Sequence, residues 1–232
     1  MNFLFDLYGT LADIHTDEEK SELWEGFAKL LGETDGDRVR AEYRAICREL
    51  ADAAEHKFVE FDLLCVFERM LAARALPTER AESLARDFRI LSREKLTLFP
   101  CVKEMLTELR ECGAGVYLVS NAQSCFTRAE LCELGIAECF DGILISSEAG
   151  VKKPHKGIFT HVSELFGISL DGCVYVGNDL HDDVLGAGGA GLGTVYIETE
   201  QSGKYPDIGV TPDFEVPTHQ AMKELLISLA TE

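Results

Sequence analysis

Several residues that could do chemistry stand where short apolar runs of the chain end or in the loop that follows. They are Asp6, Ser120–Asn121, Lys153–Pro154 and Asn178–Asp179. A carboxylate can act as a nucleophile or hold a metal, a lysine can neutralise an anion, and hydroxyl and amide groups can bind oxyanions. If the runs are strands of one parallel sheet, their carboxyl ends share an edge, and ligands bind outside that edge. The spacing therefore predicts one site built from all four clusters.

The apolar runs have the composition of buried strands. They are rich in Val, Ile, Leu, Phe and Tyr, and the predicted strands are 2–8, 115–121, 142–146, 172–178, 193–197 and 214–216. Helix-like stretches separate or follow them at 102–112, 123–134, 156–166, 181–187 and 220–230. Nearly continuous hydrophobicity and this alternation are typical of a doubly wound parallel α/β sheet covered on both faces.

The stretch after the first strand differs from the rest. From Thr16 to Leu98 the sequence is amphipathic and rich in charge, with no strand-like run. It predicts helices at 21–31, 38–54, 60–75 and 78–96. Because so long an insert exceeds an ordinary crossover, we expect an inserted all-α cap at 16–97 and an α/β core formed by 1–15 and 98–232.

The composition excludes several classes of function. The 232-residue chain has 22 Lys and Arg against 41 Asp and Glu, a formal net charge of −19. Non-specific nucleic-acid binders and polybasic membrane-surface proteins need clustered positive charge instead. No apolar run approaches the ~20 residues of a membrane span, and the first residues do not resemble a signal peptide. We therefore expect a cytoplasmic protein with no nucleic-acid or membrane partner.

The cysteines indicate neither disulfides nor a zinc site. The chain has eight, with no C-x-x-C pair and no histidine at zinc-finger spacing. Without a secretion signal, we expect reduced thiols that pack as small buried hydrophobic groups.

Taken in order, the polar clusters resemble the four motifs of the haloacid dehalogenase-like hydrolases. Asp6–Leu11 reads D-L-Y-G-T-L and is similar to motif one, D-x-D-G-T-L in the phosphatases of the family. Val119–Asn121 resembles motif two and Lys153–Pro154 motif three. Gly177–Asp183 is similar to motif four, usually G-D-x-x-x-x-D. The motif order and a helical cap after motif one also match the phosphoglycolate phosphatase-like and 2-haloacid dehalogenase-like members.

The resemblance implies a role for each motif. Asp6 would be the nucleophile that forms a covalent ester or aspartyl-phosphate, which divides one hard step into two easier ones. Lys153 would neutralise the nucleophile and the substrate. The oxygens of the transferred group would be held by Thr10, Ser120, Asn121 and Lys153, together with backbone N–H groups after Asp6.

The same resemblance implies a magnesium site. Mg²⁺ takes oxygen ligands from one or two carboxylates together with substrate phosphate. The expected ligands are Asp6, the backbone carbonyl of Tyr8 and the Asn178–Asp179 pair. Asp183 would support the metal ligands without binding the metal itself. Asp182 and His181 are expected only to favour a helix N-terminus.

Two residues depart from the phosphatase pattern. Tyr8 occupies the catalytic position where phosphatases carry the Asp that protonates the leaving group. A phenol with a pKa of about 10 is a poor base near neutrality. The D-x-Y form instead resembles the 2-haloacid dehalogenases, in which halide leaves without a proton. Asn178 stands where an Asp metal ligand is usual, and its neutral amide would weaken cation binding.

Three functions stay open on these residues. The favoured one is a Mg²⁺-dependent phosphatase of small phosphorylated metabolites, since an acid-rich motif four would repel the carboxylate substrate of a dehalogenase. The second is a metal-independent 2-haloacid dehalogenase. The third is a weakly active or non-catalytic member that binds a ligand. We expect a small anionic substrate and a monomer or homodimer.

Overall fold

The computed structural model describes residues 1–205 and 208–231, and its centre is a six-stranded sheet. The strand order is β5-β4-β1-β6-β7-β8, and all neighbours are parallel. These strands are β1 (Asn2–Phe5), β4 (Gly115–Ser120), β5 (Gly142–Ile145), β6 (Cys173–Gly177), β7 (Gly193–Ile197) and β8 (Phe214–Val216). The predicted doubly wound α/β fold is confirmed.

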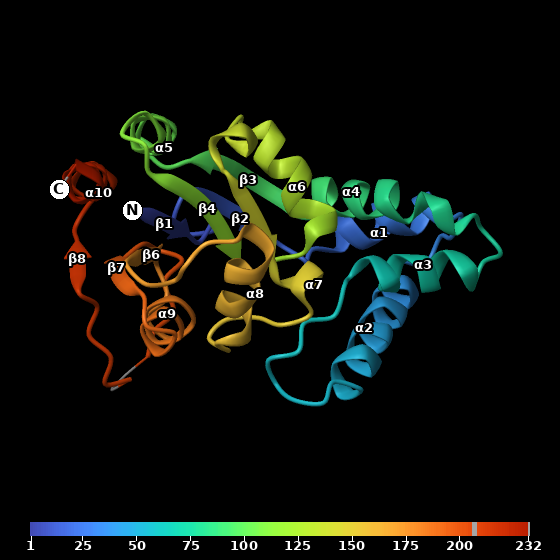
Figure 1. Ribbon diagram of the computed structural model, residues 1–232. Coiled ribbons are helices and arrows are strands. Elements are labelled where there is room, and N and C mark those ends of the chain that lie inside the picture. The colour runs from blue at the N-terminus through green and yellow to red at the C-terminus, as the bar shows by residue number, and fades with distance from the viewer. Residues whose placement is uncertain (206–207, 232) are drawn as a thin grey trace.

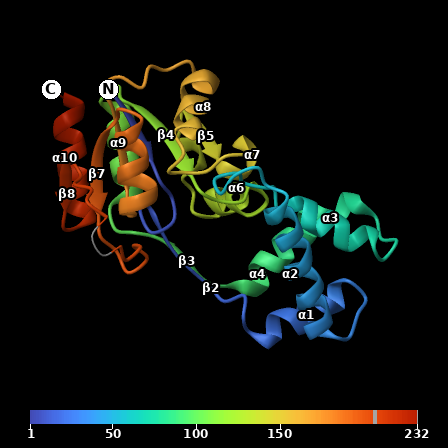
Figure 2. The ribbon, with the colours of Figure 1, turned by 90° about the horizontal axis from the view of Figure 1, so that it is seen from below.

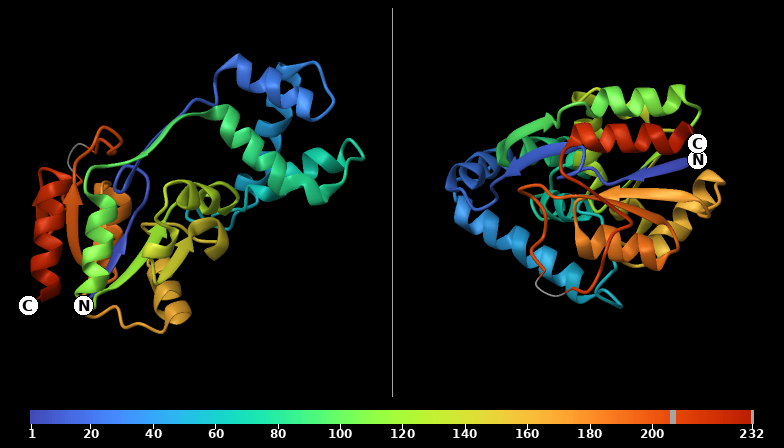
Figure 3. Two further views of the ribbon diagram at one scale, coloured as in Figure 1. Left: turned by 90° about the horizontal axis from the view of Figure 1, so that it is seen from above. Right: turned by 90° about the vertical axis from the view of Figure 1, so that its left-hand side faces the viewer.

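Helices cover both faces of the sheet, which lies between them in the right-hand view of Figure 3. On one face are α5 (Val102–Glu111) and α10 (His219–Thr231), and on the other are α8 (Gly157–Phe166) and α9 (Gly186–Gly189). Successive strand residues point to opposite faces. Phe3 and Phe5 of β1 thus pack in the cluster that contains α5 and α10, and Leu4 packs in the cluster that contains α8. Burial on both faces explains why the strands are almost wholly apolar.

A second group of helices extends beyond one end of the sheet (Figures 1 and 2). It consists of α1 (Ser21–Leu30), α2 (Gly36–Asp52), α3 (Leu64–Ala72) and α4 (Ala81–Ser92). These helices have their own apolar cluster, in which the rings of Trp24, Phe27 and Phe88 meet edge to face. The inserted helices therefore do not depend on the sheet for a core.

Two antiparallel strands connect the inserted helices to the sheet. They are β2 (Ala12–Thr16) and β3 (Arg93–Leu98), which run side by side in the left-hand view of Figure 3. The expectation that 78–96 is one helix and that 16–98 holds no strand is wrong, because α4 ends at Ser92. The two segments satisfy each other's backbone groups across the chain, so neither carries a local strand signal. The predicted boundaries between cap and core fall in this ribbon and stay a prediction.

Two expectations drawn from composition, on membrane spans and on cysteines, can be compared with the structure. None of the described helices combines the length and the apolar character that crossing a membrane requires. All eight cysteines are free, as expected. Only Cys173 is buried, however, so the expectation that the thiols act as buried hydrophobic groups is wrong for most of them.

One core helix also contributes to the core of the inserted helices. α6 (Ser124–Glu133) carries Phe126, which belongs to the same apolar cluster as Phe67 and Phe88. The Phe126 ring lies 6.2 Å from that of Phe67 and 6.3 Å from that of Phe88, centroid to centroid. The helices therefore have an anchor on the core besides the β2–β3 ribbon.

We predict that Phe126→Ala lowers the free energy of unfolding by ~3 kcal/mol, because it leaves a cavity between α6 and the inserted helices. Leu165→Ala is the control, since Leu165 is exposed and its loss changes stability by less than ~0.5 kcal/mol. Urea unfolding of both variants measures the difference. Equal losses would contradict an anchor at Phe126.

Candidate active site

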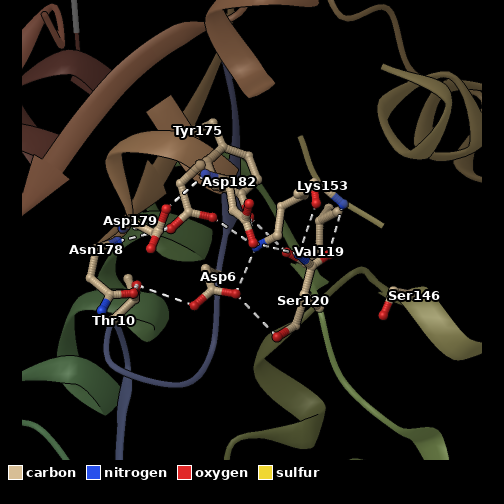
Figure 4. Close-up of polar contacts among 12 residues, drawn as sticks. Asp6, Thr10, Val119, Ser120, Ser146, Lys153, Tyr175, Asn178, Asp179 and Asp182 are labelled. Carbon is tan, nitrogen blue, oxygen red and sulfur yellow. Dashed lines mark hydrogen bonds and ion pairs between the residues drawn. The ribbon is translucent and has the colours of Figure 1, made fainter. Parts of the chain in front are cut away.

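The carboxylate of Asp6 is the centre of a polar network just beyond the end of β1 (Figure 4). β1 lies between β4 and β6, so residues that follow all three strands can reach it. Ser120 Oγ donates to Asp6 Oδ1 over 3.1 Å, and Lys153 Nζ donates to the same oxygen over 2.7 Å. Asp6 is buried, so these donors take the place of water around its charge.

Lys153 holds two carboxylates together. Its Nζ lies 2.7 Å from Asp6 Oδ1 and 2.7 Å from Asp183 Oδ1. Burial opposes the positive charge, but Asp183 and Asp6 outweigh it and raise the pKa of Lys153 well above its ordinary value. Nζ also lies 2.7 Å from the hydroxyl of Tyr175, which donates to the Val119 carbonyl. The lysine is therefore a fixed cation beside Asp6.

Motif one packs closely against motif four. Gly9 has a φ of +84°, and a Cβ there would lie 2.3 Å from Asn178 Nδ2, so any other residue would be strained and would displace the Asn178 side chain. Asn178 Oδ1 accepts a hydrogen bond of 3.1 Å from Thr10 Oγ1, and its Nδ2 donates to Thr199 Oγ1 over 3.3 Å. The amide oxygen is thereby held beside the loop that carries Asp6.

Two aspartates shape the turn of motif four. Asp183 Oδ2 accepts the backbone N–H groups of Asn178 and Asp179, at 3.0 and 2.9 Å. Asp179 Oδ1 accepts those of His181 and Asp182, at 2.8 and 2.7 Å. The bonds to Asp179 cap the following helical turn, Leu180–Leu185, whose first amides would otherwise lack partners.

Two further sequence-predicted residues, Thr10 and Asn121, lie in different places. Thr10 is fully buried, and its hydroxyl is 3.4 Å from Asp6 Oδ2. Asn121 borders the pocket, but its side chain bonds the backbone N–H and carbonyl of Lys153 at 2.8 and 3.1 Å. Asn121 thus connects motif two to motif three. The roles of Thr10 and Asn121 in holding substrate oxygens stay predictions.

These groups open into one pocket. It is lined by Asp6, Tyr8, Ser120, Asn121, Lys153, Asn178, Asp179, Asp182, Asp183 and Gln201. Lys153 is the one cation among these described residues. Because the aspartates outnumber it, the pocket is strongly acidic. The atoms that could bind a metal there are mostly carboxylate and amide oxygens, which suit a hard divalent cation.

Sequence reasoning missed four residues of this site. Asp182 was expected only to favour a helix start, yet it borders the pocket and accepts a 3.0 Å bond from Asn121 Nδ2. Gln201 also lines the pocket, and Tyr205 donates to Asp179 Oδ2 over 2.8 Å. Both follow β7, where no motif marks them. Tyr175 is the one of the four that the sequence could have indicated, because it is the only tyrosine in the strand before motif four.

Tyr8 places its hydroxyl away from Asp6. The hydroxyl donates to Glu130 and lies 3.0 Å from Thr127 Oγ1, both on α6. Burial raises the pKa of Tyr8 above its ordinary value, and Glu130 adds to the rise. The phenol is therefore neutral and is already used as a hydrogen-bond donor.

The family follows from comparison of the whole chain with known proteins. The family model for haloacid dehalogenase-like hydrolases matches residues 1–191, which include all four motifs. The chain belongs to the haloacid dehalogenase-like hydrolases. The resemblance seen in the motifs is thereby confirmed, and so is the expectation of a hydrolase.

Two curated relatives of this hydrolase are phosphatases. Glyceraldehyde 3-phosphate phosphatase of Methanopyrus kandleri is 33% identical over 139 residues, 58% of each chain. Phosphoserine phosphatase of Thermus thermophilus is 30% identical over 151 residues, 65% of this chain and 59% of the relative. In both cases the chain spans less than two thirds of the relative's length.

Solved structures share the fold without deciding the reaction. A haloacid dehalogenase-like phosphatase from Thermococcus onnurineus has a TM-score of 0.62 at 21% identity, with 97% of each chain covered. A 2-haloacid dehalogenase from Pseudomonas syringae has a TM-score of 0.63 at 19% identity, again with 97% of each chain covered.

We predict that Lys153→Met destabilises the hydrolase by about 3–5 kcal/mol, because it leaves Asp6 and Asp183 buried without their shared cation. Lys152→Met is a matched control. Lys152 is 37% exposed and pairs with Glu60 at 3.5 Å, so its loss costs less than ~1 kcal/mol. Thermal and urea unfolding of the two variants measure the contrast. Similar losses at both positions would show that the buried ion triad contributes little.

Proposed function

We propose that this hydrolase is a Mg²⁺-dependent phosphatase of small phosphorylated metabolites that acts through an aspartyl-phosphate on Asp6. The observation that carries the proposal is the placement of Asp6 against Lys153 and Ser120 at the floor of an acidic, oxygen-rich pocket. The phosphatase names of the curated relatives support the same reaction.

In this proposal Asp6 is the nucleophile, and two neighbours hold it in place. Lys153 balances the charge of the Asp6 carboxylate, and Ser120 helps to fix its orientation. One carboxylate oxygen attacks phosphorus, the bond to the leaving group breaks, and water then hydrolyses the acyl phosphate. Backbone N–H groups after Asp6 and the charge of Lys153 stabilise the oxygens of the transferred group.

The charge of the pocket supports the cation. A phosphate dianion cannot approach four aspartates and one lysine without repulsion unless further positive charge is present. The carboxylates of Asp6 and Asp179, the amide oxygen of Asn178 and the carbonyl of Tyr8 would hold Mg²⁺. Asp179 also belongs to a group of potential ligand atoms within 4.8 Å of one another, with His181 and Asp182. The ion would supply charge neutralisation for the phosphoryl group.

The same charge disfavours the dehalogenase alternative. A 2-haloacid carries a carboxylate that would meet these aspartates without a neutralising metal. Tyr8 is the feature that favours a dehalogenase, and its hydroxyl is turned toward α6 rather than toward the pocket. The third alternative, a ligand-binding member with little activity, stays open to the experiment below.

The proposal also covers the substrate class, the oligomeric state, the partners and the compartment. We expect a small anionic substrate and a monomer or homodimer without nucleic-acid or membrane partners. Free thiols throughout the chain support a reducing compartment such as the cytoplasm.

We predict Mg²⁺-dependent hydrolysis of p-nitrophenyl phosphate that EDTA abolishes and added Mg²⁺ restores. Asp6→Asn should lower kcat by at least about 1,000-fold, since it removes the nucleophile. Asp171→Asn, at an exposed aspartate outside the pocket, should leave it unchanged. Halide release from 2-chloropropionate despite EDTA would establish the dehalogenase. Inactivity on both substrates, with stabilisation by inorganic phosphate, would favour the ligand-binding member.

The missing acid at position 8 predicts a preference among leaving groups. Without a proton donor, the enzyme should favour substrates whose leaving group has a low pKa, such as acyl and aryl phosphates. Tyr8→Asp should raise turnover of β-glycerophosphate, an alkyl phosphate, by about 10-fold or more relative to p-nitrophenyl phosphate. Tyr8→Phe is the control, because it removes the hydroxyl without adding an acid. Equal gains on both substrates, or none, would count against this preference.

A further inference from the structure

The hydroxyl of Tyr8 belongs to a buried ionic cluster that motif analysis does not explain. Glu130 on α6 accepts from this hydroxyl, and its side chain is only 2% exposed. Arg89 donates to Glu130 through Nε at 2.8 Å and Nη2 at 3.3 Å. Arg93 lies 3.3 Å from the same carboxylate. We call Tyr8, Glu130, Arg89 and Arg93 the Glu130 cluster.

The Glu130 cluster brings together three parts of the chain. Tyr8 lies in the loop that carries the nucleophile, Glu130 in a core helix, and the arginines at the junction of α4 and β3. The guanidinium of Arg89 also lies 5.0 Å from the ring centroid of Phe126 and 5.8 Å from that of Tyr8. A buried carboxylate is costly unless it is paired and hydrogen-bonded. Its partners are therefore held in fixed positions.

We propose that Glu130 is a positioning residue, which fixes the nucleophile loop to the inserted helices by accepting the Tyr8 hydroxyl while it pairs with Arg89 and Arg93. It touches no substrate in this role. Tyr8 is two residues beyond Asp6 and precedes Gly9, whose N–H donates to the Ala12 carbonyl over 2.8 Å. Fixing the Tyr8 side chain also fixes the backbone from which the pocket wall is made.

The alternative is that the cluster only adds stability. A displacement of about 1 Å at reacting groups can cost about 100-fold in rate, so a positioning contact should change kcat. A purely structural contact should lower the melting temperature and leave kcat unchanged. The two roles are thus separable by experiment.

The first test compares Tyr8→Phe, Glu130→Gln and the double variant on p-nitrophenyl phosphate. We expect each single variant to lower kcat by about 10-fold with KM within about two-fold, because ground-state binding is untouched. The double variant should lose no more than the larger single loss, since both changes break one contact. Glu133→Gln is the control. It breaks the exposed Arg93–Glu133 pair, at 2.8 Å, without reaching Tyr8, and should leave kcat unchanged.

The second test does not need activity. Amide hydrogen exchange across 7–12 should quicken in Tyr8→Phe and Glu130→Gln but not in Glu133→Gln, because this loop is held by its own bonds and by Tyr8. The kinetic test rests on the proposed phosphatase activity, whereas exchange does not. Unchanged exchange in Tyr8→Phe, or a lower melting temperature with unchanged kcat, overturns the positioning role. If the unaltered protein hydrolyses no phosphate ester, the proposed function fails and exchange alone decides the role of Glu130.

Discussion

The ion triad of Asp6, Lys153 and Asp183 is the interaction on which the site depends. Each charge is buried, and each would be unfavourable alone, so the end of β1, the loop after α7 (Ser146–Ala149) and the turn after β6 must meet. Tyr175 within β6 and Ser120 at the end of β4 add further hydrogen bonds to the triad. The sheet order makes this meeting possible, because β1 lies between the two strands that precede motifs two and four.

The charge balance of the pocket restricts its chemistry. One lysine can neutralise one carboxylate, and the triad already uses it for two. An anionic substrate therefore needs positive charge that the lining residues do not supply. The charge of the pocket, rather than the fold, favours the proposed phosphatase over a dehalogenase, since solved structures with both names share the architecture.

Tyr8 shows how one residue of a motif can take part in a different interaction. A phosphatase of the family carries an acid at this position, directed at the leaving group. Here Tyr8 still borders the pocket, but its hydroxyl reaches Glu130, whose charge Arg89 and Arg93 balance. The absence of a proton donor at this position and a contact with the inserted helices thus come from the same residue. No lining residue comes from those helices in the part of the chain that the structure describes. Their influence on the pocket therefore runs through contacts such as the one with Tyr8.

The sequence by itself determined the parallel sheet, the inserted helices and the residues that meet at the strand ends. These depend on local features, namely continuous apolar runs, helical periodicity and polar residues at fixed places after each run. Only the tertiary structure decided the β2–β3 ribbon, the participation of Gln201 and Tyr205, and the direction of the Tyr8 hydroxyl. Each of these depends on a partner far away in the chain, such as Glu130, 122 residues beyond Tyr8. A rotamer or a strand pair is selected by the groups that surround it after folding, and no local pattern records them.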